Sequence, residues 1–553
     1  MNLSGPLTIF AVVSCHWQEL QDHNREKGVC GMGKAFLMTP GDGRPTANAY
    51  WMEDHKFVIP KVEHAIRGNG MEPVWLHDNT TAIASWAQAK QAGLKLLAEA
   101  EKGDVLVMLF TGWAWPEHAG VLFPMIQERV RSGDLKVILV CNMKEKAPGY
   151  VGACAAALKL EIMQLPYELL AVVNPSEVGW AKLKTALGQV MSGTYKRPRF
   201  VDPGVEVTDA HRKIARDAIR LIRESGCVGL SINASSMTMA QGWPHYSLCS
   251  RLGVTPIFIG SHEFEEAMAA IPQSRVHETY DLLLSTGIRI EYQDGGLCEE
   301  EIWEALRMYL VKLDYHKQGA LCMGTQGQME QIRRVATDLS ESLMMSTISP
   351  FKVRPVIDVT EADWEALFTS VLMQYIVYVK TGIWKPIGFH DIRHYCLAED
   401  TLVLLNSGAL ALDFMTDTPG GYSDIRLVSQ NREVYFLNGG AAVMGNMRAC
   451  RDATLARFHG FGMGYKLVVS RMHILPLAWE QRASVYGLLD KWPMGIVQIP
   501  GQVQEPHDPS LTPTLLATLA HRPNHGQHSA DYIVPELIAA SEELELPYAV
   551  MAG

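Results

Sequence analysis

The sequence predicts an α/β protein with two doubly wound parallel α/β domains followed by a β-rich, barrel-like C-terminal domain. Short apolar runs alternate with amphipathic stretches through residues 1–195 and again through residues 196–350, a pattern typical of βαβ units. From residue 351 to residue 553, strand-like runs become more frequent than long helices, and glycine pairs appear. A chain of 553 residues is also too long for one core, since domains average about 150 residues.

The first domain, residues 1–195, is expected to be a flavodoxin-like layer of five parallel strands. Because helices cover both faces of such a sheet, its strands are apolar throughout and do not alternate. Amphipathic stretches separate them, and residues 195–207, which contain proline and glycine without periodicity, end the domain. The apolar runs lie at residues 7–13, 73–76, 105–110, 137–140 and 169–173.

The second domain, residues 196–350, is expected to continue this alternation, and the third, residues 351–553, to be a mixed or mainly antiparallel β domain such as a barrel. An apolar, β-branched run at 352–359 leads from one into the other. The expected helices are 209–225, 263–270 and 299–313, and the expected strands are 228–232, 254–259, 401–405, 465–470 and 474–477.

The composition excludes several classes of function. With 49 basic and 60 acidic residues the net charge is −11, and the chain lacks the concentrated basic face that nucleic-acid binding requires. No apolar run reaches the roughly 18 residues of a membrane-spanning helix, and no export signal is recognisable, so we expect a cytoplasmic protein. The ten cysteines form no CxxC pair, which argues against a zinc knuckle.

Nucleotide-binding and serine-hydrolase motifs are also missing. The sequence contains no GxxxxGK(S/T) loop, no GxGxxG fingerprint after a strand and no GxSxG elbow. The glycines of Gly31-Met32-Gly33-Lys34 are therefore interpreted as a structural turn and not as a phosphate site.

Three short stretches of the C-terminal domain carry candidate chemistry. Glu361 follows a strand-like run and precedes an apolar helix, Asp391 lies between a histidine and an arginine, and His525 lies among other histidines in a polar loop. Taken singly, these stretches are better explained as a helix N-terminus capped by Thr360, a surface salt bridge and a solvated loop. Taken together, a Glu, an Asp and a His suit a divalent cation with open positions. They are far apart in the sequence, so only the fold can bring them together.

Five segments of the chain are Gly324-Thr325-Gln326-Gly327-Gln328, Val359-Thr360-Glu361-Ala362-Asp363, His390-Asp391-Ile392-Arg393-His394-Tyr395, residues 405–413, and Asn524-His525-Gly526. In this order along the chain, they resemble the L-fucose isomerase family within the wider L-fucose/L-arabinose isomerase group, as in a distant member. In the N-terminal half, residues 111–115 resemble an aromatic loop that family members insert beside the sugar of a neighbouring subunit, and residues 235–237 resemble a turn of the second domain. An arginine motif expected after the first strand is absent, since Ser14-Cys15-His16-Trp17 stands there.

The resemblance implies a metal-dependent aldose–ketose isomerase that acts on a monosaccharide, fucose- or arabinose-like or modified, through a cis-enediol. It implies Glu361 and Asp391 as catalytic carboxylates, and a site for Mn²⁺, with Mg²⁺ as a substitute, formed by Glu361, Asp391 and His525. It also implies a homo-oligomer, a hexamer or a trimer, without nucleic-acid or membrane partners. The expected substrate-binding residues are Gln328, Ser407, Asn524, Trp113, Trp115 and Tyr435.

Two alternatives to an isomerase stay open. A metal-dependent sugar lyase or epimerase would use a similar enediolate on a modified sugar. A non-catalytic sugar-binding protein would also use two α/β domains in tandem.

Overall fold

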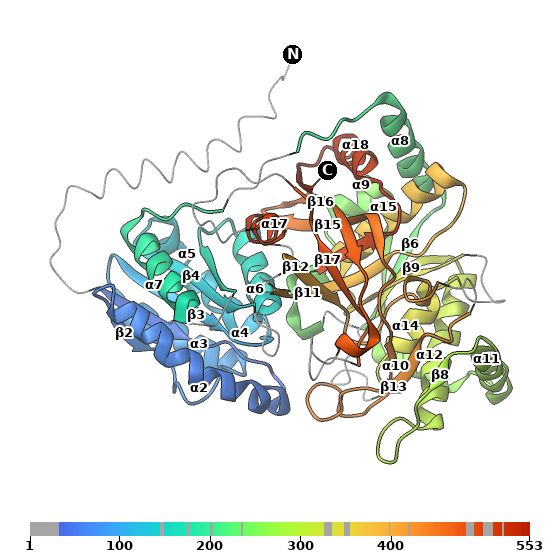
Figure 1. Ribbon diagram of the computed structural model, residues 1–553, viewed down its shortest axis with the longest axis horizontal. Helices are drawn as coiled ribbons and strands as arrows, with labels where there is room; N and C mark the ends of the chain where they lie inside the picture. Colours follow the sequence, from blue (N-terminus) through green and yellow to red (C-terminus); the bar gives the residue numbers. More distant parts are fainter. Residues whose placement is uncertain are drawn as a thin grey trace.

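The computed structural model arranges the described chain around three main sheets (Figure 1). The N-terminal α/β region (blue to teal) lies beside the C-terminal strands (orange and red), and the second α/β region (green and yellow) lies on their other side (Figure 1). Within the described ranges no helix is both long and apolar enough to cross a membrane. The described residues are 33–143, 149–173, 177–198, 203–233, 236–325, 334–347, 354–396, 399–417, 421–482, 491–501, 512–522 and 525–552.

The N-terminal region is a five-stranded parallel sheet in the order β2-β1-β3-β4-β5, with helices on both faces. Helices α2 and α7 share one apolar core with the sheet, and helices α3, α5 and α6 share the core on its other face. The expected doubly wound layer is therefore confirmed. Its strands are β1 (Lys34–Met38), β2 (Glu72–Trp75), β3 (Asp104–Phe110), β4 (Leu135–Asn142) and β5 (Glu168–Val172). Its helices are α2 (Pro45–Arg67), α3 (Trp86–Glu99), α4 (Glu117–Gly120), α5 (Leu122–Arg131), α6 (Tyr150–Ile162) and α7 (Glu177–Ser192).

The strand next to β3 is β1, whereas the strand expected at residues 7–13 lies outside the described residues. The sequence of β1 is Lys-Ala-Phe-Leu-Met, which has no β-branched residue, so propensity does not identify it as a strand. Its four apolar side chains are fully buried in the two cores of the sheet. The interpretation of residues 31–34 as a turn is wrong at Lys34, because this residue begins β1.

The second region is a four-stranded parallel sheet in the order β10-β9-β6-β7. The predicted helices near 209–225, 263–270 and 299–313 and the strands at 228–232 and 254–259 are confirmed to within a few residues. The strands are β6 (Val228–Ile232), β7 (Thr255–Ile259), β9 (Ala320–Thr325) and β10 (Ile357–Thr360). The helices are α8 (Asp209–Glu224), α9 (Tyr246–Leu252), α10 (Ser261–Ala269), α11 (Gln273–Ser285), α12 (Glu299–Lys317), α14 (Asp338–Met345) and α15 (Trp364–Thr381).

The C-terminal strands close into a barrel. The sheet runs β15-β18-β11-β12-β17-β16, and a further pairing of β15 with β16 closes the ring, so that these strands leave no free edge. The two strands expected at 465–470 and 474–477 are one long strand, β16. The strands are β11 (Gly388–Cys396), β12 (Thr401–Leu405), β15 (Cys450–Phe461), β16 (Gly464–Leu475), β17 (Met494–Gln498), β18 (His525–Ser529) and β19 (Tyr548–Ala552), which pairs with β16. Helices α17 (Pro513–His521) and α18 (Val534–Glu543) lie outside the barrel, and β8 (Arg289–Ile290), β13 (Arg426–Ser429) and β14 (Ala441–Met444) form a small separate sheet.

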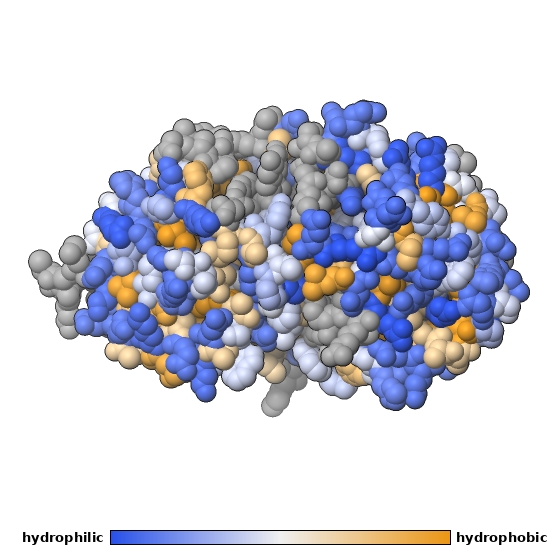
Figure 2. Space-filling model, turned by 90° about the horizontal axis from the view of Figure 1, so that it is seen from below, coloured by the Kyte–Doolittle hydropathy of each residue, from blue (hydrophilic) through white to orange (hydrophobic). Residues whose placement is uncertain are grey.

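Helix α15 lies where the second sheet meets the barrel. Its buried side chains, among them Trp364 and Phe368, share one core with α8, with β9 and β10, and with Phe458 of β15. The turn that precedes α15 is thereby held between two sheets, which favours a precisely placed site. On the outer face seen in Figure 2, hydrophobic side chains of the described residues are interspersed with hydrophilic ones.

Candidate active site

Glu361 occupies a strained turn between β10 and α15. Both Glu361 and Ala362 have left-handed backbone conformations, with φ of 67° and 50°, which cost about 1–2 kcal/mol each for residues other than glycine. The turn is held by the Ala362 amide, which donates to the Thr325 carbonyl at 3.2 Å. It is also held by the Thr360 hydroxyl, which donates to Glu341 at 2.7 Å. The reversed turn directs Glu361 away from the helix axis and into a pocket.

The cap of α15 is Asp363, not Thr360 as the sequence suggested. Its Oδ1 accepts a hydrogen bond from the Ala366 amide at 2.9 Å. Because this one residue completes the helix N-terminus, Glu361 is not needed there. The structural explanation of Glu361 as part of a cap is therefore wrong.

Asp391 and His525 face each other on neighbouring antiparallel strands. Residue 391 of β11 is the register partner of residue 525 of β18, so strand pairing joins two segments far apart in the sequence. His525 Nε2 lies 3.2 Å from Asp391 Oδ1 and 3.8 Å from Glu361 Oε2. The polar loop expected around His525 is a strand at this residue, and the imidazole is only 1% exposed.

Burial and charge set the protonation of this cluster. Burial raises the pKa of Glu361 to about 7, with Asp391 adding to the rise. For His525, burial lowers the pKa, but the hydrogen bond to Asp363 and the nearby carboxylates outweigh it, so the pKa is raised. Burial alone would raise the pKa of Asp363, but Arg457 and His525 together hold this pKa below the ordinary value. Glu361 is thus poised to exchange a proton near neutral pH.

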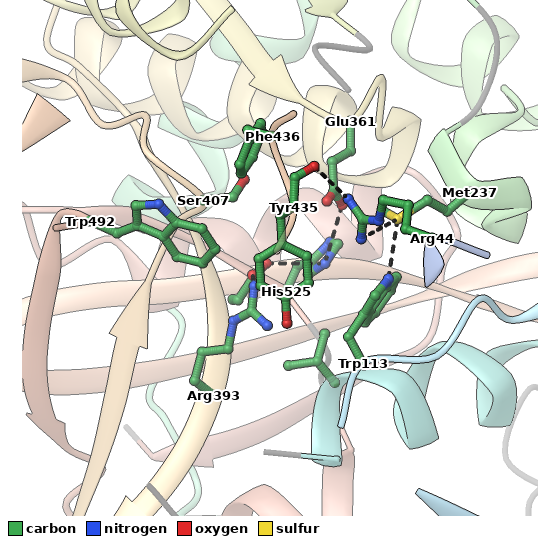
Figure 3. Close-up of a pocket in the computed structure, with 12 residues that line it drawn as sticks. Arg44, Trp113, Met237, Glu361, Arg393, Ser407, Tyr435, Phe436, Trp492 and His525 are labelled. Atoms are coloured by element: carbon green, nitrogen blue, oxygen red, sulfur yellow. Dashed lines mark hydrogen bonds and ion pairs between the residues drawn. The ribbon is translucent and has the colours of Figure 1, made fainter. Parts of the chain in front are cut away.

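The pocket gathers side chains from all three regions, and they point into one space in Figure 3. Asp391 pairs with Arg393, so the predicted salt bridge exists, but it is buried in the pocket and not on the surface. The guanidinium of Arg393 also lies 5.7 Å from the ring of Trp492. The residues that line the pocket are Arg44, Trp113, Val151, Met237, Glu361, Asp391, Arg393, Ser407, Tyr435, Phe436, Trp492 and His525.

Arg44 is a pocket residue that the sequence analysis missed. It follows β1 after a short turn, and its guanidinium donates two hydrogen bonds to Asp42, at 2.8 and 2.6 Å. Its Nη1 donates to the Tyr435 carbonyl at 3.3 Å, and its guanidinium lies 4.9 Å from the Tyr435 ring. Arg44 thus follows the first described strand of this sheet. The expectation about an arginine motif after residues 7–13 lies outside the described residues.

Of the predicted substrate-binding residues, Ser407, Trp113 and Tyr435 line the pocket. Trp113 donates from its indole to the sulfur of Met237 at 3.1 Å, from within the same chain. Trp115 is not among the lining residues and stacks on His118, with ring centroids 5.6 Å apart. Gln328 and Asn524 lie outside the described residues.

The Ser407 loop is fixed by a buried polar network. Gln430 donates to the Ser407 carbonyl at 2.6 Å and to Asp338 at 2.7 Å, and it accepts from the Trp492 indole at 2.9 Å. Gly408 has φ of 122°, and a Cβ there would lie 2.3 Å from Gln430 Nε2. Only glycine allows this close approach, which places Ser407 at the pocket wall.

The cluster suits a divalent cation in its donor chemistry. Among the described residues, no three His, Cys, Asp or Glu side chains already surround a common metal position. However, Glu361 Oε2 is buried without a hydrogen-bond partner among these residues. His525 Nδ1 donates to Asp363 at 2.8 Å, because a carboxylate can only accept, which leaves the Nε2 lone pair facing Glu361 and Asp391. A carboxylate behind a metal-binding histidine is typical of metal sites.

Comparison with known proteins does not assign the chain. No protein-family model matches the sequence, and no curated protein matches it either.

Proposed function

We propose that the protein is a divalent-metal-dependent aldose–ketose isomerase of a monosaccharide, distantly related to the L-fucose isomerases. The observation that carries the proposal is the convergence of Glu361, Asp391 and His525, from three distant segments, in one buried pocket. Two carboxylates beside one imidazole supply acid/base groups and hard-metal ligands together. The order of the five sequence segments adds independent support.

Glu361 is assigned as the proton carrier between the two adjacent sugar carbons. Asp391 is already ion-paired with Arg393, whereas Glu361 Oε2 has no hydrogen-bond partner among the described residues. With a pKa of about 7, this carboxyl can take a proton from C2 and return it to C1. The hydroxyl proton moves from O2 to O1 in the same conversion, so aldose becomes ketose without loss of atoms.

Glu361, Asp391 and His525 would hold a Mn²⁺ or Mg²⁺ ion. When bound, such an ion stabilises negative charge that develops on the sugar oxygens. Asp363 orients the imidazole for this role, and Arg393 neutralises part of the negative charge of the two carboxylates.

The remaining pocket residues suit a sugar. Ser407 and Arg44 offer polar groups, and Trp113, Tyr435 and Trp492 offer aromatic faces on which the C–H faces of a sugar can pack. Both arginines of the pocket are already paired with carboxylates. A homo-oligomer stays a prediction, although Trp113 reaches the pocket from its own chain and needs no neighbour to bring it there.

The test is an NMR assay of the purified protein with Mn²⁺ and a panel of aldoses and ketoses in D₂O. We expect interconversion of one aldose–ketose pair, deuterium at C1 or C2 of the product, and loss of turnover after chelation. Product fragments with fewer carbons would identify a lyase. Inversion of a centre without movement of the carbonyl would identify an epimerase, and binding without conversion would favour a sugar-binding protein.

A further inference from the structure

We infer that Arg457, on β15, is a positioning residue that fixes the metal-binding side of His525 and acts through Asp363. The inference rests on the proposed function, because it concerns the imidazole that would ligate the metal. Arg457 itself is not among the residues that line the pocket, and its side chain is only 1% exposed.

The carboxylate of Asp363 is held by three donors from three elements. Oδ1 accepts from the Ala366 amide at 2.9 Å in the first turn of α15. Oδ2 accepts from His525 Nδ1 at 2.8 Å and from Arg457 Nη2 at 2.8 Å. The helix cap alone fixes one oxygen, and Arg457 fixes the direction of the other. The orientation of the His525 ring therefore depends on Arg457, although the two side chains share only this carboxylate.

Arg457 is itself fixed by a second carboxylate. Its Nη2 also donates to Glu365 Oε2 at 3.0 Å, and the other oxygen of Glu365 accepts from the Gly460 amide at 2.9 Å. A Cβ at position 460 would lie 2.9 Å from that oxygen, so glycine permits the contact. A buried guanidinium between two carboxylates is paired and directional, unlike an ammonium group.

One strand locates both partners of the Asp363–His525 hydrogen bond. Strand β15 holds the start of α15 through Arg457 and Gly460, and it also pairs with β18, with Ala456 opposite Gln527. His525 is two residues from that register position on β18. The positions of Asp363 and His525 therefore both depend on β15, and a change at Arg457, which does not itself line the pocket, alters their relative orientation.

The experiment measures the dissociation constant of Mn²⁺ alone, by electron paramagnetic resonance titration, for the full-length protein without sugar. For Arg457→Met we expect Mn²⁺ binding to weaken by about 10- to 100-fold, the range for residues that orient a metal ligand. Arg457→Lys keeps the positive charge but not the planar donor, so we expect an intermediate loss. If Arg457→Met does not fold, the Mn²⁺ dissociation constant of Arg457→Lys provides the test.

The matched control is Thr454→Val, on the same strand. Thr454 is fully buried, donates to the Asp531 carbonyl at 2.9 Å and accepts from the Ile533 amide at 2.8 Å, but it has no contact with Asp363 in the described chain. We expect this variant to lower the thermal unfolding temperature and to leave the Mn²⁺ dissociation constant within about twofold of wild type, since its lost hydrogen bonds affect stability only.

Two results would overturn the inference, and they can be told apart. If wild type binds Mn²⁺ and folded Arg457→Lys or Arg457→Met binds it equally well, the positioning role is wrong and the proposed function stands. If wild type itself binds no Mn²⁺, the metal-dependent function and the positioning role are both wrong. Equal weakening in Thr454→Val and Arg457→Met would also count against Arg457, because general loss of packing would then explain the effect.

Discussion

The two walls of the pocket are built in different ways. One side, formed by the barrel together with the turn between β10 and α15, is here called the barrel wall; buried hydrogen bonds and strand register hold Glu361 and His525 in fixed directions there. On the N-terminal side, here called the aromatic wall, Arg44 and Trp113 follow strands of another sheet, and the Trp113 indole contacts the sulfur of Met237 in the second α/β region. Directional polar contacts fix angles, whereas aromatic and sulfur contacts mainly fill space.

This difference suggests that the two walls have different functions. Groups that move a proton or hold a metal need orientation within about 0.5 Å, which the barrel wall supplies. Groups that recognise a sugar ring need area and shape, which the aromatic wall supplies. Changes in the barrel wall should therefore lower kcat, and changes in the aromatic wall should mainly raise KM.

The largest effect is expected for Glu361→Gln. Glutamine keeps the shape of the side chain but cannot exchange a proton, so kcat should fall by about 10²–10⁴-fold while the fold is retained. The isomerase assay by NMR measures the rate, and circular dichroism checks the fold. Turnover at the wild-type rate would show that Glu361 does not transfer the proton. It would also contradict the catalytic role assigned to the barrel wall.

A buried ion pair outside the pocket stabilises the strand that leads to Glu361, and a substitution can remove it without changing a pocket residue. Lys312 Nζ lies 2.6 Å from Asp358 Oδ2 on β10, and both side chains are fully buried. Lys312→Met removes the ammonium group that neutralises the buried carboxylate of Asp358, so the free energy of unfolding should fall by about 3–5 kcal/mol.

Urea denaturation measures this loss for Lys312→Met. The double variant with Asp358→Leu removes both charges and should regain much of the stability. A single variant as stable as wild type would mean that this pair does not support the strand that leads to Glu361.

A buried histidine next to the aromatic wall should make the stability of the protein depend on pH. His55 on α2 lies 2.9 Å from the hydroxyl of Thr111, two residues before Trp113. Burial lowers the pKa of His55 from 6.5 to about 4, and His77 contributes to this. The unfolded chain therefore binds a proton below pH 6.5 that the folded chain does not bind until about pH 4.

The stability from neutral His55 is complete above pH 6.5 and is lost as the pH falls towards 4. The loss should reach about 2 kcal/mol at pH 5. His55→Gln should flatten this part of the curve of stability against pH, measured by urea denaturation at each pH. The same slope in wild type and His55→Gln would show that another group causes it.

The sequence predicts the individual helices and strands of this molecule better than it predicts which of them lie next to one another. Strand β3 and helix α12 were expected close to their observed bounds, because continuous apolar runs and amphipathic periods are local properties. Strand β1 was missed, since its five residues acquire their strand conformation from neighbours on both sides. Arg44 was missed with it, because its place depends on where the first strand ends.

The candidate site shows the same limit. Glu361, Asp391 and His525 were selected by residue type and by resemblance, but their separate patterns favoured a cap, a surface ion pair and a loop. The true cap, Asp363, is two residues away, and the register of β11 with β18 cannot be read from either strand alone. Non-local pairing, not local propensity, decides that these side chains meet.

The smallest effect is expected in the aromatic wall, where two neighbouring tryptophans give a matched pair. Trp113→Phe removes part of a pocket-lining ring and its contact with Met237, so KM should rise about tenfold with kcat little changed. Trp115→Phe should leave KM within about twofold, because Trp115 stacks on His118 and does not line the pocket. Steady-state kinetics on the sugar found by the NMR assay distinguish the two. A rise in KM for Trp115→Phe alone would restore the prediction made from sequence. A fall in kcat for Trp113→Phe would show that the aromatic wall also takes part in aligning the reacting carbons, and the two walls would then not divide binding from chemistry.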